Sequence, residues 1–189
     1  MNQDNFATLP GLIHVKRAME IAVAGNHSIT VIDCNGYDEQ YTKAFHDIGG
    51  EVIHVIKPCP CGNLSHPNRT CVCSFSRIKQ YRARVKYQKA LQSDIVIESG
   101  YIRERDFDTK HNEVAAAVLE RIRTIVKVEP VLTPDAQKLF DRAYSALKMN
   151  ARDRDTALQI AVTIAGLDKG VMIETRYIAE AVQYIYKNN

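Results

Sequence analysis

The pattern of hydrophobic and polar positions divides this chain into two parts. Up to about residue 109, short β-branched runs alternate with segments of helical spacing. The β-branched runs predict strands over 28–32, 51–56 and 94–98. The other segments predict helices over 12–24, 38–48 and 76–91. A strand, a short helix and another strand are typical of a right-handed parallel crossover, so we expect an α/β core with a short parallel sheet.

From residue 111 onwards, hydrophobic residues recur at helical spacing. Thr133-Pro134-Asp135 marks a helix start, because proline suits the first helical position. The predicted helices begin near residues 111, 134, 152 and 174, and the last one ends near 186. We therefore expect residues 111–189 to form an α-helical bundle that follows the α/β core of residues 1–109.

The composition is that of an ordinary soluble domain, with 189 residues, 46% hydrophobic and 25% charged. The sequence has no apolar run of the roughly eighteen residues that span a bilayer and no signal-peptide pattern before Pro10, so we expect a cytoplasmic protein without a membrane partner. The net charge of +3 is unevenly distributed. Residues 52–93 contain no aspartate or glutamate but eight lysines and arginines, which makes this segment the unusual one.

Four of the five cysteines also fall in the basic segment, as two close pairs: Cys59, Cys61, Cys71 and Cys73. Four thiolates can enclose a tetrahedral Zn²⁺, and their softness favours zinc or iron–sulfur over magnesium or calcium. The single residue between the members of each pair is a tighter spacing than usual, and His66 is an alternative ligand. A reduced loop without metal and a pair of disulfides are the other interpretations. A closed set of four ligands is typical of a structural site rather than a catalytic one.

The predicted helix over 76–91 carries a dense positive charge, interleaved with Tyr81 and Tyr87. Its basic residues are Arg77, Lys79, Arg82, Arg84, Lys86 and Lys89. Such residues bind phosphates in a salt-sensitive, sequence-independent way, and tyrosines can stack on unpaired bases. The helix is therefore a candidate nucleic-acid-binding element. The alternative is that these side chains contact acidic protein surfaces or lie over apolar ones.

Three sequence blocks lie around the cysteines: residues 57–62 (Lys-Pro-Cys-Pro-Cys-Gly), Cys71-Val72-Cys73 and residues 78–85. They resemble the N-P-C-P-C-G, C-x-C and R-Y-x-x-R-L blocks of the ComM-like branch of magnesium-chelatase-type AAA+ ATPases, at the family's spacing. Residues 16–27 are similar to the family's helix before the P-loop. Segments similar to its helical lid lie at 132–147, 160–167 and 178–184.

This resemblance implies a reduced AAA+ (P-loop-like) core over residues 1–109, with a cysteine-rich loop at 57–73 and a basic helix at 76–91. Residues 111–189 then correspond to the family's C-terminal α-helical lid. The family associates with DNA recombination, so the resemblance implies nucleic acid or a related AAA+ ATPase as partner.

The nucleotide-binding parts of the family are largely missing from this sequence. A P-loop uses glycines, a lysine and a hydroxyl to hold phosphates and Mg²⁺. The corresponding segment, 33–40, keeps only Gly36 and carries three carboxylates, which would repel a triphosphate. The Walker B run is absent, Lys57 replaces the sensor asparagine, and Gln92 replaces the arginine that acts in trans. Arg152, at the lid sensor position, is the retained element.

We therefore expect a non-catalytic pseudo-ATPase that acts as a binding or regulatory module, without ATP or Mg²⁺. One alternative is an ATPase subunit whose nucleotide site is completed by another chain in a hetero-oligomer. The other alternative is a zinc-stabilised nucleic-acid-binding protein.

Overall fold

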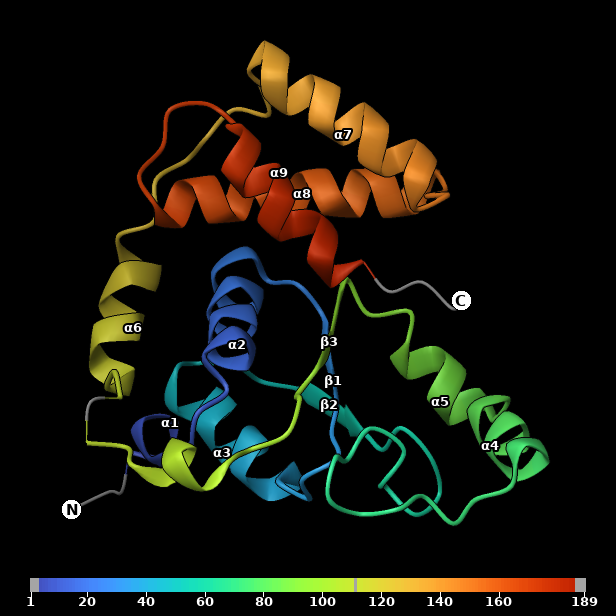
Figure 1. Ribbon diagram of the computed structural model, residues 1–189. Helices are drawn as coiled ribbons and strands as arrows, with labels where there is room; N and C mark the ends of the chain where they lie inside the picture. Colours follow the sequence, from blue (N-terminus) through green and yellow to red (C-terminus); the bar gives the residue numbers. More distant parts are fainter. Residues whose placement is uncertain (1–3, 111, 186–189) are drawn as a thin grey trace.

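Three short parallel strands form the centre of the first half of the chain. In the computed structural model, which describes residues 4–110 and 112–185, they are β1 (Ile29–Ile32), β2 (Ile53–Ile56) and β3 (Ile95–Glu98), in the order β2-β1-β3 (Figure 1). β1 pairs in register with both neighbours, Ile29 lying beside Ile53 and Ile95. All four residues of β1 are buried, as expected of a central strand covered on both faces. The predicted short parallel sheet is confirmed.

Helices cover both faces of this sheet. α2 (Ile13–Gly25) and α3 (Asp38–Asp47) pack on one face, where the side chains of Ile29 and Val31 join the main hydrophobic cluster. α4 (Phe75–Arg82) and α5 (Val85–Ala90) follow the cysteine loop, and α5 packs on the opposite face. α2 ends at Gly25, and Asn26 caps it in the left-handed conformation that the Gly-Asn pair predicts.

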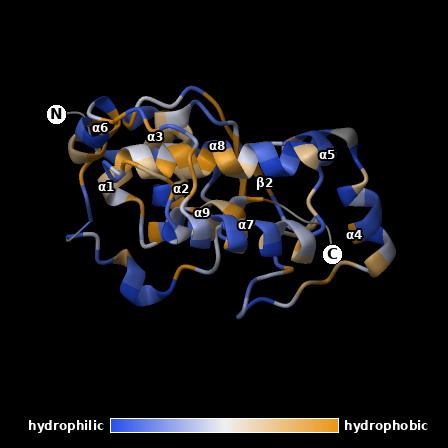
Figure 2. Cartoon of the chain, turned by 90° about the horizontal axis from the view of Figure 1, so that it is seen from above, coloured by the Kyte–Doolittle hydropathy of each residue, from blue (hydrophilic) through white to orange (hydrophobic). Residues whose placement is uncertain are grey.

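The second half of the chain is helical, as predicted. Its helices are α6 (Ala115–Arg123), α7 (Pro134–Ala146), α8 (Ala151–Leu167) and α9 (Thr175–Ala181). α6 lies against α2 and the short α1 (Asn5–Thr8), whereas α7 and α8 both pack on α9, and α8 also packs along α2 (Figure 1). Hydrophobic residues gather around α8 and α2, while α4 and α5 at one end are largely hydrophilic (Figure 2). One buried cluster therefore joins the helical part to the α/β core.

The predicted continuous helix over 76–91 is wrong, because the chain breaks between α4 and α5. Arg84 has an extended backbone at this point, with φ −64° and ψ 140°. The Arg82 guanidinium donates to the carbonyl of Pro58 at 3.2 Å, and the Gln88 amide donates to the carbonyl of Arg82 at 2.7 Å. These tertiary and capping contacts replace the helical hydrogen bonds that the sequence pattern alone would favour.

Smaller differences from the predicted elements lie at element ends. α1 and a 3-10 turn, η1 (Glu104–Phe107), are four residues each and were not predicted. α9 ends at Ala181 and continues as the 3-10 turn η2 (Val182–Tyr184), while residues 111 and 186, at the predicted helix ends, lie outside the described residues. Across the described ranges, no helix combines the length and apolar character needed to cross a membrane.

Candidate metal centre and vestigial phosphate loop

The four clustered cysteines lie in the loop between β2 and α4, close to the carboxyl ends of the strands. Pro60 and Gly62 shape the first half of this loop: the N–H of Gly62 donates to the carbonyl of Cys59 at 3.0 Å, and Gly62 has a φ of +83°, which favours glycine. This turn places Cys59 and Cys61 next to each other, and the second half of the loop brings Cys71 beside them. Cys59 is fully buried and the other three are half-buried.

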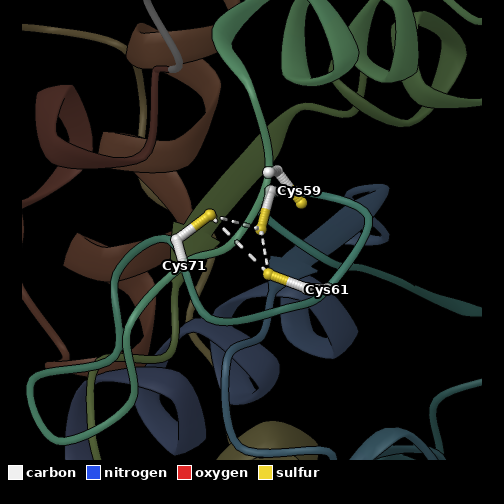
Figure 3. Close-up of side chains that lie close together, drawn as sticks. Cys59, Cys61 and Cys71 are labelled. Carbon is white, nitrogen blue, oxygen red and sulfur yellow. Dashed lines mark hydrogen bonds between the residues drawn. The ribbon is translucent and has the colours of Figure 1, made fainter.

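The sulfurs of this cluster have the spacing of a metal site. Sγ of Cys59 lies 3.4 Å from Sγ of Cys61 and 3.7 Å from that of Cys71, and the last two are 3.6 Å apart (Figure 3). The ligand atoms of all four cysteines, Cys73 included, lie within 4.8 Å of one another. Four sulfurs about 2.3 Å from a tetrahedral Zn²⁺ would be about 3.8 Å apart. All of these cysteines are free, so the cluster could hold a metal ion.

The protein also stabilises negative charge at one of these sulfurs. Backbone N–H groups of Asn63 and Val72 lower the pKa of the Cys61 thiol to about 6. At Cys71, the N–H of Cys73 acts in the same direction, but desolvation and the neighbouring sulfurs outweigh it and raise the pKa to about 12. One thiol of the cluster thus loses its proton readily, and the resulting thiolate makes ionisation of a neighbouring thiol less favourable. A bound cation would remove this penalty by neutralising the negative charge.

Contacts outside the cluster hold the loop in place. His66 is not part of the group of four: its ring packs edge-on against Tyr101 at 4.7 Å, and its Nδ1 accepts from the N–H of Asn68. The Asn68 amide in turn donates to the Tyr101 hydroxyl at 3.1 Å. On the other side, Arg82 clamps the carbonyl of Pro58. No local sequence pattern indicates Tyr101 as a support of this loop, because that contact joins segments far apart in the chain.

The predicted nucleic-acid-binding residues lie on two helices rather than one. Arg77 and Lys79 on α4 are exposed, as are Arg84, Lys86 and Lys89 around α5. Within the described residues none of them takes part in an ion pair, and Arg82 is turned toward Pro58. Tyr81 and Tyr87 pack against each other at 5.4 Å, and Tyr87 is only 4% exposed. Tyr87 is therefore not available to stack on a base.

The vestigial phosphate loop follows β1, and a carboxylate occupies its centre. Asp33 is 2% exposed and turns back into its own loop. Its Oδ2 accepts from the N–H of Gly36 at 2.6 Å and from the N–H of Tyr37 at 3.0 Å. In a P-loop, amides at such a strand-to-helix turn hold phosphate. Here the side chain of Asp33 takes that place.

Side chains complete the environment of the Asp33 carboxylate. Its Oδ1 accepts from the Tyr41 hydroxyl at 3.0 Å, the Ser99 hydroxyl at 2.9 Å and the Asn35 amide at 3.1 Å. Desolvation alone would raise the pKa of Asp33, but the hydrogen bonds from the backbone and from Ser99 outweigh it and lower the pKa below its ordinary value. The sequence pointed to repulsion of phosphate at this loop. The structure shows that the Asp33 carboxylate instead accepts hydrogen bonds within the protein. One of its donors, Ser99, lies 66 residues away in the sequence.

The two retained nucleotide-site residues lie at opposite ends of the sheet. Gly36 follows the carboxyl end of β1, with open space around its Cα. Arg152 lies at the start of α8 and donates to the carbonyl of Gln92 at 3.0 Å, just before the amino end of β3. It lines a small cleft with Ser93 and Asp94. Within this chain, Arg152 therefore does not reach the Asp33–Tyr37 loop.

Comparison with known protein families gives two matches. Residues 79–185, more than half of the chain, match the family described as magnesium chelatase, subunit ChlI C-terminal. Residues 41–107 match the family described as magnesium chelatase, subunit ChlI, and this range includes the four clustered cysteines. No curated protein matches the sequence.

Replacing Cys71 with serine should remove one ligand of the candidate metal centre. We expect wild-type protein to retain one metal ion per chain after dialysis, with an affinity that rises with pH because the thiols must lose their protons. Cys71→Ser should bind metal at least about 100-fold more weakly. Loss of a residue that only supports a ligand already costs up to about 100-fold, and Cys71 would be a ligand itself. Metal analysis and chelator competition measure both. Cys34→Ser is the matched control, because Cys34 lies outside the cluster and its thiol donates to the carbonyl of Gly100. Equal affinity in all three proteins would contradict the site.

Replacing Asp33 with asparagine tests the internal carboxylate. At neutral pH the substitution should lower the free energy of unfolding by about 1.5–3 kcal/mol, the range for hydrogen bonds to a charged group. Because the pKa of Asp33 is lowered by folding, its contribution is complete above the unfolded value of about 3.9 and is lost as pH falls through the folded value. The gap between wild type and Asp33→Asn should therefore narrow below about pH 4 in urea unfolding. Asp38→Asn, on the exposed start of α3, should cost at most about 1 kcal/mol. A gap that is constant with pH would rule out this role.

Proposed function

The chain belongs to the magnesium chelatase ChlI family of AAA+ proteins, and from this membership we propose that it is a non-catalytic member, a pseudo-ATPase that acts as a binding or regulatory module. The chain keeps a parallel three-stranded sheet and a helical second half. The groups needed for phosphoryl transfer are not retained.

The observation that carries this proposal is the position of the Asp33 carboxylate. A phosphate in this loop would need the N–H groups of Gly36 and Tyr37, and both already donate to Asp33. It would also meet a buried negative charge at hydrogen-bond distance. Two anions about 4 Å apart repel by about 4 kcal/mol at the effective dielectric constant of a protein surface. This repulsion and the occupied donors both oppose nucleotide binding.

The residues at the other catalytic positions support the same conclusion. Lys57 and Gln92 stand where the resemblance expects the sensor asparagine and the trans-acting arginine. Arg152 is separated from the loop by the length of the sheet. Phosphoryl transfer depends almost entirely on positioned charge, so the combined loss is difficult to reconcile with turnover. A second chain could supply an arginine, but it could not free the amides that Asp33 occupies.

Zinc is the metal that we propose for the cysteine centre. Four thiolates form a soft, closed ligand set, and sulfur separations of 3.4–3.7 Å fit the tetrahedral geometry that Zn²⁺ prefers. Such a site has no open coordination position for a substrate. Its role would be to hold the 57–73 loop, and with it the position of α4, as a stable part of a binding surface.

Nucleotide binding is the most direct test of the pseudo-ATPase proposal. We expect millimolar ATP·Mg²⁺ to leave the melting temperature unchanged and no phosphate to be released. A ligand present at 100 times its Kd would add about 2.7 kcal/mol of stability, which a thermal-shift assay detects. Arg152→Ala should behave as wild type in both assays. A saturable rise in melting temperature with ATP·Mg²⁺ would overturn the proposal, and loss of that rise in Arg152→Ala would favour the subunit completed in a hetero-oligomer.

A further inference from the structure

β2 is one of the two edge strands of the sheet, and one of its sides has no partner strand among the described residues. The carbonyl of Ile56 accepts from the N–H of Asp33 at 2.8 Å, which fixes the side of Ile56 that faces β1. Backbone groups alternate along a strand, so the N–H and C=O groups of Ile53 and Val55 point away from β1. Within residues 4–110 and 112–185, no other segment donates to or accepts from these outward groups. They form a free template for one more strand.

Two adjoining cavities follow this free edge. One has a volume of about 590 Å³ and lies along Ile53 to Ile56, and the other has a volume of about 290 Å³ and continues from Val55 toward Lys57. Lys86 lines both of them. The edge of β2 therefore lies at the base of a continuous groove and is not covered by a helix.

The rim of the groove is strongly basic. Lys57, Arg84, Lys86 and Lys89 line it, against the single carboxylate of Asp38. None of these four cations takes part in an ion pair within the described residues. The groove thus combines unpaired backbone groups, apolar side chains and an excess of positive charge.

Packing of α5 on the sheet fixes the direction of the lysines. Tyr87 and Ala90 are buried against Ile32, Ile56 and Val96 in a small hydrophobic cluster. With that face of α5 held on the sheet, Lys86 and Lys89 lie along the edge of β2. The fold therefore places both lysines at the rim of the groove.

We propose that the free edge of β2 takes up an extended, acidic segment of a partner protein as a fourth strand. Main-chain hydrogen bonds to Ile53 and Val55 would supply affinity, and alternate acidic side chains would meet Lys86 and Lys89. Strand addition at β2 would be the contact through which the proposed binding module acts. The inference rests on the proposed function only in assuming that the chain binds a partner protein. A second copy of the chain is a poor occupant, because two basic rims would face each other. Nucleic acid would use the cations but not the outward N–H and C=O groups.

The experiment uses the full chain and a fluorescein-labelled peptide of alternating glutamate and valine, seven residues long. We expect fluorescence anisotropy to show saturable binding that weakens with salt. Lys86→Glu combined with Lys89→Glu should lower the affinity by about tenfold, the effect of two surface charge pairs. Lys127→Glu combined with Lys138→Glu, two exposed residues of the helical part, is the matched control and should bind as wild type.

Two further arms separate strand addition from simple charge attraction. Val55→Pro removes an outward N–H without breaking a hydrogen bond to β1. We expect circular dichroism to show that this variant folds, and anisotropy to show that it loses most of the peptide binding. Peptides N-methylated either at every valine or at every glutamate should differ, because strand addition uses the N–H groups of alternate residues only. Equal binding of both methylated peptides would overturn the proposal. Displacement of the labelled peptide by oligothymidylate to the same extent in wild type and in Val55→Pro would also overturn it. So would no binding at low salt. Because these assays contain no nucleotide, their failure is distinguishable from failure of the pseudo-ATPase proposal.

Discussion

The carboxylate of Asp33 connects the elements on which the rest of this structure depends. It accepts hydrogen bonds from the loop amides of Gly36 and Tyr37, from Tyr41 on α3 and from Ser99 just after β3. One buried charge therefore joins the end of the central strand, the start of the next helix and the neighbouring strand. A charge without these donors would be costly in this place, so the loop is committed to solvating its own side chain. In the proposed function, this internal use of the amides is what opposes nucleotide binding in the loop.

The cysteine centre is supported separately from that loop. Arg82 on α4 and Tyr101 after β3 hold the 57–73 segment at two points, and the sulfurs converge without any contribution from Asp33. This separation is consistent with the proposed function, in which the cysteine loop and the helical part are retained without phosphate chemistry. The sheet has three strands, and the outer edge of β2 has no partner strand among the described residues. Lysines line the groove along that edge. These features support the proposed role as a binding module.

Local sequence signals predicted much of this fold, and long-range contacts account for what they missed. The three strands, the Gly25-Asn26 cap and the helix start at Thr133-Pro134 follow from short patterns. The break between α4 and α5 does not, because it depends on Arg82 reaching Pro58. For the site, cysteine spacing predicted the cluster of four thiols that the structure brings together, while repulsion of phosphate by the carboxylates of residues 33–40 stays a prediction. The inward turn of Asp33 and the distance of Arg152 from that loop required the tertiary structure.

The amide resonances of Gly36 and Tyr37 report most directly on whether Asp33 fills the phosphate loop. In ¹H–¹⁵N spectra, both should shift together as pH falls through the lowered pKa of Asp33 and the carboxylate is protonated, because their N–H groups then lose a charged acceptor. At neutral pH, addition of ATP·Mg²⁺ should leave both resonances unmoved. A saturable displacement of these two resonances by ATP·Mg²⁺ at neutral pH would contradict a pseudo-ATPase and place a nucleotide in this loop.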